Sequence, residues 1–148
     1  MDILSIAILV FVVLEALNIL VLYFAPDSRK GNGVGVFKAY EESKDHPEVR
    51  ALIGYLINWV AGTKIIFVVL LIVILVTGTT TTRVFAVVAL LVSILSFYWR
   101  LYPALRRMDA RGAISPRGYA RTLGIMIGCF VGGFVAALAV HLLTGGGA

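Results

Sequence analysis

Charged residues are scarce in this sequence. Asp, Glu, Lys and Arg make up 14% of its 148 residues, whereas 60% are hydrophobic. A soluble domain is about one quarter charged and about half apolar, and one small core could not bury so much apolar sequence. The composition therefore excludes an ordinary soluble domain and predicts a membrane protein. The net charge of +5 is then explained by membrane topology rather than by nucleic-acid binding.

Cysteines and catalytic motifs are also lacking. Cys129 is the single cysteine, so neither an intrachain disulfide nor a thiolate metal cluster can form. The sequence contains no Walker loop, GxSxG, HExxH or Cys-x-x-Cys motif, and no nucleophile–base pair is evident. We therefore expect no cofactor and no metal site, and enzymatic activity is the least supported class of function.

Four long apolar runs account for most of the chain. Each reaches the ~20 residues that one helical span needs, and none shows the polar–apolar alternation of a membrane strand. Helix-start and helix-stop residues extend the runs into predicted helices of about 3–24, 47–77, 82–111 and 116–143, joined by loops 25–46 and 112–115. The sequence thus predicts an all-α integral membrane protein, a single bundle of four transmembrane helices whose first span is an uncleaved helix.

The distribution of Lys and Arg predicts the orientation. Eleven of these residues lie in or beside the loops 25–46 and 112–115, and only Arg83 lies on the opposite side. Because cytoplasmic loops carry the excess of Lys and Arg, both loops are predicted to face the cytoplasm. The amino and carboxyl termini would then lie outside, and we expect the plasma membrane to be the host membrane.

A few polar residues fall inside the predicted spans. Glu15 lies nine residues before Phe24, ~14 Å along a helix, and Lys64 lies twelve residues after Leu52, ~18 Å. A charge at such a depth costs at least ~2.5–3.5 kcal/mol, so we expect the two side chains to pair. The predicted polar site comprises Glu15, Asn18, Asn58, Thr63 and Lys64, although Lys64 falls roughly 120° around the helix from Asn58.

Two interpretations of this polar site remain open. In the first, the Glu15–Lys64 pair is a structural ion bridge that fixes the register of two helices. In the second, Glu15 is a protonatable carboxylate whose pKa responds to a ligand or to Lys64, which would make it a transport or coupling site. A pair that contacts a cofactor or a partner subunit is a third possibility.

Arginines gather around the second predicted cytoplasmic loop. Because guanidinium groups bind phosphate in a bidentate manner, the expected partner is the anionic headgroup layer of the membrane, and a specific lipid or phosphorylated ligand is the alternative. The cluster consists of Arg106, Arg107, Arg111, Arg117 and Arg121.

Small residues repeat every four positions along the last span. Such a stripe lets helix backbones approach closely in lipid, either against another helix of the same chain or in a homodimer, and we expect a homo-oligomer. The stripe consists of Ala120, Gly124, Gly128, Gly132 and Ala136.

The layout resembles that of small multidrug resistance transporters in two points. A glutamate, Glu15, lies midway along the first span, and the fourth span is rich in glycine. The chain departs from that family in its long first loop, in Lys64 and in its strong charge bias, which argues against antiparallel dimers. The resemblance is architectural and implies a transport function.

The sequence supports three functional hypotheses. The first is a small transporter or channel-like module built around the Glu15–Lys64 site. The second is an accessory or assembly subunit of a larger membrane complex, which the lack of soluble domains and catalytic motifs favours. The third is an anionic-lipid-binding membrane protein that uses the arginine cluster. The substrate is not specified by any motif.

Overall fold

The computed structural model describes residues 2–29 and 33–145, and its regular elements there are helices. The four long ones are α1 (Ile3–Phe24), α3 (Pro47–Thr77), α4 (Thr80–Ala110) and α5 (Tyr119–Leu143). All four are long and apolar enough to cross a membrane, which confirms the prediction of a four-span helical membrane protein. Between α1 and α3 lie the short helix α2 (Lys38–Glu42) and two 3₁₀ turns, Val34–Val36 and Ser43–Asp45.

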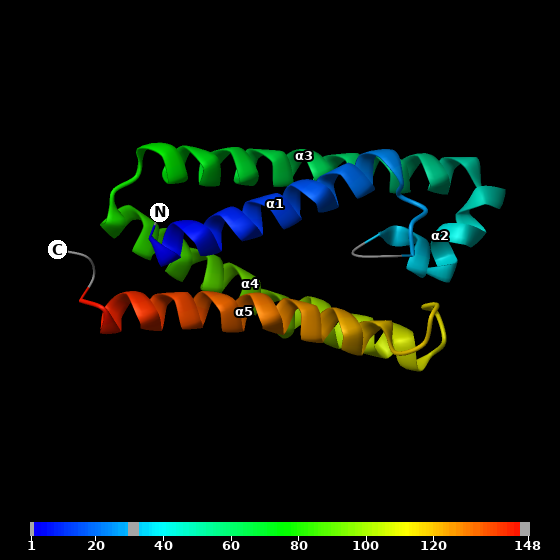
Figure 1. The fold of residues 1–148 in the computed structure, drawn as a ribbon. Coiled ribbons are helices and arrows are strands. Elements are labelled where there is room, and N and C mark those ends of the chain that lie inside the picture. The colour runs from blue at the N-terminus through cyan, green and yellow to red at the C-terminus, as the bar shows by residue number, and fades with distance from the viewer. Residues whose placement is uncertain (1, 30–32, 146–148) are drawn as a thin grey trace.

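The helices pack as two antiparallel pairs. α1 packs most extensively against α3 and α4 against α5, and α1 also contacts both α4 and α5. The start of α1 and the end of α5 lie at one end of the bundle, which we call the terminal end (Figure 1). The opposite end holds the connecting segments 33–46 and 111–118 and is called the loop end. The main core lies between the four helices and includes Leu4, Ile8, Val68, Val87 and Phe134.

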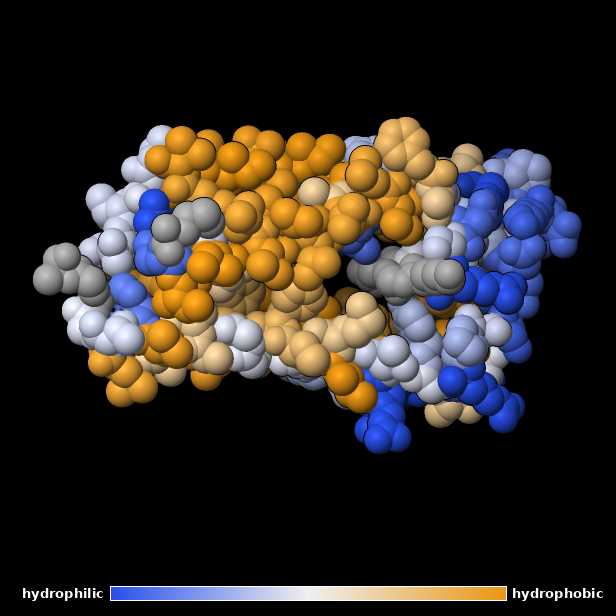
Figure 2. All heavy atoms as spheres, in the orientation of Figure 1, coloured by the Kyte–Doolittle hydropathy of each residue, from blue (hydrophilic) through white to orange (hydrophobic). Residues whose placement is uncertain are grey.

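The surface between these two ends is apolar. Large hydrophobic side chains stay exposed along every long helix, among them Val13, Ile66, Val92 and Ile125. Figure 2 shows a broad hydrophobic band flanked by polar residues at both ends, most densely at the loop end. Because hydrocarbon is the medium that such a band prefers, the surface fits a bundle that is surrounded by lipid.

The loop end is held by backbone pairing between two distant segments. The amide of Ser115 donates to the carbonyl of Val36 at 2.8 Å, and the amide of Lys38 donates to the carbonyl of Ala113 at 3.0 Å. A second, smaller core lies beneath this pairing and includes Leu105. The pairing joins the connection that precedes α3 to the connection that precedes α5.

Arg50 fastens the first connection to α3. Its guanidinium donates to the Tyr40 carbonyl at 3.0 Å, pairs with Asp27 at 3.2 Å and stacks on the Tyr40 ring at 4.0 Å. Burial, together with the nearby Asp27 carboxylate, raises the pKa of Tyr40 above its ordinary value of 10.0.

The turn between α4 and α5 differs from its prediction. Gly112 adopts the left-handed conformation (φ 72°) expected after a helix, but the last helix begins at Tyr119 instead of residue 116. Its N-cap position is Gly118, also left-handed, and the Asp109 carboxylate accepts from the amides of Gly118 and Ala120, both at 3.0 Å. A carboxylate from the preceding helix therefore caps α5 in place of a residue next to the helix start.

Candidate functional site

The predicted pairing of Glu15 with Lys64 is present at mid-depth of the bundle. The Lys64 ammonium lies 2.6 Å from a Glu15 oxygen and donates to the Asn18 side-chain oxygen at 2.8 Å. Glu15 and Asn18 are three residues apart on α1, so one face of that helix presents both acceptors. The Glu15 and Lys64 side chains are 21% and 24% exposed, which makes this cluster a partly accessible polar group inside the apolar band.

Glu15 and Lys64 of this cluster line a cavity of about 620 Å³ between α1, α3 and α4, and Asn18 lies outside its lining. Two further polar side chains line it, Thr63 and Ser93. The remaining walls are aromatic and aliphatic, and they consist of Phe11, Trp59, Val60, Phe67, Leu90 and Ile94. A cavity of this size is within the usual range for a small-molecule site, where a few polar groups orient a ligand held by apolar walls.

Asn58 does not join this cluster. Its side chain is exposed on α3, because six residues at about 100° each place it roughly 120° around the helix from Lys64. Thr63 does line the cavity, but its hydroxyl donates to the Trp59 carbonyl at 2.9 Å. The structure thus brings Glu15, Asn18 and Lys64 into contact, places Thr63 at the cavity that Glu15 and Lys64 line, and leaves Asn58 outside the site.

The cluster retains hydrogen-bonding capacity toward the cavity. An ammonium group has three donors, and Lys64 uses two of them on Glu15 and Asn18. Glu15 uses only one of its carboxylate oxygens within the described part of the chain. Among those same residues, no group of three or more His, Cys, Asp or Glu side chains is placed to hold a metal. The chemistry on offer is therefore ion pairing and hydrogen bonding.

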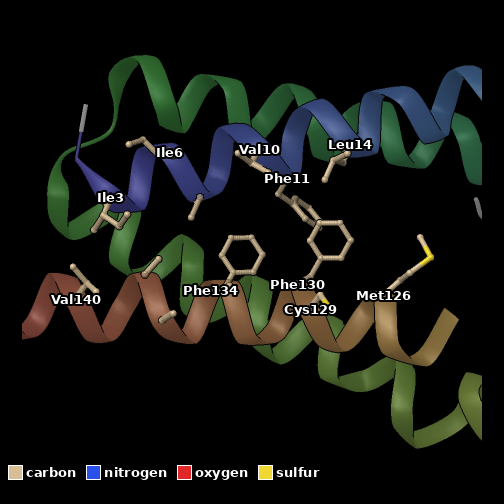
Figure 3. A pocket seen from close by; sticks show the side chains of 14 residues that line it. Ile3, Ile6, Val10, Phe11, Leu14, Met126, Cys129, Phe130, Phe134 and Val140 are labelled. Atoms are coloured by element: carbon tan, nitrogen blue, oxygen red, sulfur yellow. The ribbon is translucent and has the colours of Figure 1, made fainter. Parts of the chain in front are cut away.

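A second cavity, of about 600 Å³, lies between α1 and α5 and has an almost entirely apolar lining. Figure 3 shows Phe11, Phe130 and Phe134 meeting in it, with ring centroids 5.4 and 5.5 Å from Phe11. Phe11 also packs against Phe67 at 6.0 Å and lines both cavities. Cys129 is exposed at this second cavity.

The arginine cluster projects from the loop end. Arg106, Arg107, Arg111, Arg117 and Arg121 are all exposed, and none forms an ion pair with another described residue. Asp109, the acid in their midst, is occupied by the first turn of α5. The cluster therefore presents a positive surface that the carboxylates of residues 2–29 and 33–145 do not neutralise.

The small-residue stripe is divided into two halves. Ala120 and Gly124 are buried, and a Cβ at Gly124 would lie 2.7 Å from the Tyr102 ring. Tyr98 donates to the Gly124 carbonyl at 2.6 Å and approaches Gly128. This half packs against α4. The other half, Gly132 and Ala136, is exposed, so the homo-oligomer stays a prediction.

An ion pair that the sequence did not suggest closes the terminal end. Arg83 of α4 donates to Asp2 at 2.7 Å and to the Leu75 carbonyl of α3 at 3.2 Å. Asp2 also caps α1 by accepting from the Ser5 amide at 2.7 Å. Burial raises the pKa of Asp2, but these hydrogen bonds from Ser5 and Arg83 outweigh it and hold the pKa below 3.8. The sequence signal that could have indicated this cap is Asp2, an acid placed directly before an apolar run.

Comparison with known proteins adds no family to this description. No family model, no curated protein and no solved structure matches the chain. What the chain is therefore follows from its own composition and geometry. It is a small helical membrane protein with four spans and a polar cluster at mid-depth.

Proposed function

We propose that the chain is a small transporter or channel-like module whose ligand binds at the Glu15–Lys64–Asn18 cluster. The observation that carries this proposal is an ion pair that lines a cavity of about 620 Å³ at mid-depth of the bundle. A pair needed only to fix helix register would be most stable when sealed by packing. This one lines a cavity instead, although charges at this depth are costly.

The proposal includes the sidedness of the membrane. The charge distribution supports cytoplasmic connections 25–46 and 111–118, with both termini outside in the plasma membrane. In a Cys129→Ser background, an impermeant maleimide added to intact cells should label Thr144→Cys and not Arg111→Cys. Labelling of Arg111→Cys would overturn the orientation.

A flux assay tests the transport role. Purified protein in liposomes is compared with Glu15→Gln for proton flux, potassium flux and efflux of an uncharged fluorescent amphiphile. At least one flux should exceed that of protein-free vesicles and fall tenfold or more in the variant. Asn58→Ala is the matched control, because this polar residue of α3 lies outside the cluster and should leave the flux unchanged. Equal fluxes for Glu15→Gln and the parent protein would refute the transport role.

The arginine cluster supports anionic-lipid binding as a second candidate function. Its five exposed guanidinium groups have no carboxylate partner among the described residues, because Asp109 caps α5. Each basic residue near an anionic membrane surface contributes about 1 kcal/mol. Native mass spectrometry should retain anionic lipid on the parent protein and lose it when Arg107 and Arg111 are both replaced by Ala. Lys44→Ala, which removes an exposed cation paired with Glu41, is the control.

A further inference from the structure

The charges that line the mid-depth cavity balance each other. Glu15 and Lys64 are its ionisable lining residues, and they form one ion pair. Thr63 and Ser93 add polarity without charge. A ligand with a net charge would therefore bring an uncompensated ion to the middle of the bilayer, which costs at least ~2.5–3.5 kcal/mol. A ligand with no net charge avoids that cost.

The cavity opens on the side of α3 and α4. Trp59 is 63% exposed at its edge, whereas Phe11 and Leu90 are buried at its base. The surrounding faces of α3 and α4 carry exposed apolar side chains such as Ile66 and Val92, which suit contact with lipid tails. A ligand would therefore reach the opening from the hydrocarbon and not from water.

The lining also constrains the shape and polarity of the ligand. Aromatic side chains from α1 and α3, namely Phe11, Trp59 and Phe67, form walls that suit a flat ring. Lys64 offers a third N–H donor, Glu15 a second acceptor oxygen, and Ser93 a hydroxyl that can do both. Together these groups match a ring that carries carbonyl or hydroxyl substituents.

We infer that the ligand of this cavity is a lipophilic molecule of zero net charge with a hydrogen-bonding ring, of the quinone or phenol type, which enters laterally between α3 and α4. An ordinary phospholipid is a poorer fit, because its headgroup lies at the membrane surface, ~15 Å from mid-depth. This inference rests on the proposed binding role of the cluster and names the substrate class for it.

Tryptophan fluorescence can test the inference. The chain has two tryptophans: Trp59 lies at the cavity, and Trp99 is 79% exposed on α4 outside it. In nanodiscs, a decyl-substituted benzoquinone should quench the Trp99→Phe variant, which reports on Trp59, in a saturable manner. The Trp59→Phe variant, which reports on Trp99, should show only the linear quenching of a quinone dissolved in lipid. Equal curves for the two variants would overturn the inference.

Competition then tests the charge class. A decylphenol should displace the quinone at a concentration at least tenfold lower than decyltrimethylammonium or decyl sulfate. Ser93→Ala should weaken the decylphenol several-fold, whereas Asn58→Ala should not change it. If either charged amphiphile displaces the quinone as effectively as decylphenol does, the ligand is not neutral and the inference is refuted.

The two proposals can fail separately. A Glu15-dependent ion flux without saturable quenching of Trp59 would overturn the neutral ligand and leave the transport role standing. Saturable binding of the quinone without any Glu15-dependent flux would support the ligand class and refute transport. A second copy of the chain that covers Trp59 would abolish saturable quenching and would likewise refute lateral access.

Discussion

Two ion pairs of nearly equal length lie at different depths of this bundle. Lys64 and Glu15 are 2.6 Å apart at its middle, and Arg83 and Asp2 are 2.7 Å apart at its terminal end. The pair at the end has supporting contacts, because Asp2 caps α1 and Arg83 also bonds α3. The middle pair has Asn18 and an adjoining cavity. Similar distances therefore accompany different surroundings: backbone support at the end and open space in the middle.

Breaking the middle pair should have the largest effect on stability. Lys64→Ala leaves the Glu15 carboxylate unpaired at mid-depth, and removal of one partner of a buried pair costs about 3–5 kcal/mol. The free energy of unfolding, measured by denaturant titration in mixed micelles, should fall accordingly. The double variant Glu15→Gln with Lys64→Met should recover most of the loss. If the double variant is as unstable as Lys64→Ala, the unpaired charge is not the cause.

Breaking the pair at the terminal end should cost less. Arg83→Ala removes hydrogen bonds to Asp2 and to the Leu75 carbonyl, and hydrogen bonds of charged groups contribute about 1.5–3 kcal/mol. Water can solvate the partly exposed Asp2 at this end, so the lower part of that range is expected in the same titration. A loss larger than that of Lys64→Ala would reverse the ranking by depth.

Removing Asp109, an acid that pairs with no cation in the described part of the chain, provides a third point. Asp109→Ala deletes the carboxylate that accepts from the Gly118 and Ala120 amides, and the loss of a helix cap costs about 0.5–2 kcal/mol. Hydrogen exchange of these two amides should accelerate, while exchange in the middle of α5 stays unchanged. Uniform acceleration along α5 would show that Asp109 does more than cap the helix.

The smallest effect on stability is expected when low pH protonates Asp2 at the terminal end. Because the pKa of Asp2 lies below 3.8 in the folded protein, its contribution is fully present above the unfolded-state pKa and is lost as the pH falls through the folded value. The contribution should stay below about 1 kcal/mol, since the side chain is partly exposed. Asp2→Asn should remove this portion of the pH dependence below pH 4, which a titration of thermal stability can measure.

Local signals in the sequence predicted the helices well. The ends of α1 were obtained from hydrophobicity alone, and α3 begins at Pro47 as expected for a helix-starting proline. The start of α5 was wrong because its cap comes from Asp109, nine residues before Gly118 in the chain. The bridge between Phe37 and Ile114 could not be predicted, since it depends on how the two helix pairs dock.

The sequence predicted those contacts of the site that depend on the depth of a residue in the membrane. Glu15 and Lys64 have few alternatives to each other at mid-membrane, so their pairing followed from counting residues along two helices. Asn58 was included on polarity alone, and its angular offset from Lys64 explains its exposure. Ser93 and the aromatic walls carry no sequence pattern that separates them from ordinary lipid-facing residues, and only the packing of α1, α3 and α4 reveals them.

The backbone pairing of Val36 and Lys38 with Ala113 and Ser115 has a consequence for membrane insertion. Segments that share backbone hydrogen bonds must emerge at the same water interface, so the chain between them must cross the bilayer an even number of times. If one helix pair inserted in the opposite orientation to the other, those amides and carbonyls would be left without hydrogen-bond partners. This one short bridge can therefore form in the folded state only if the number of crossings between the two segments is even.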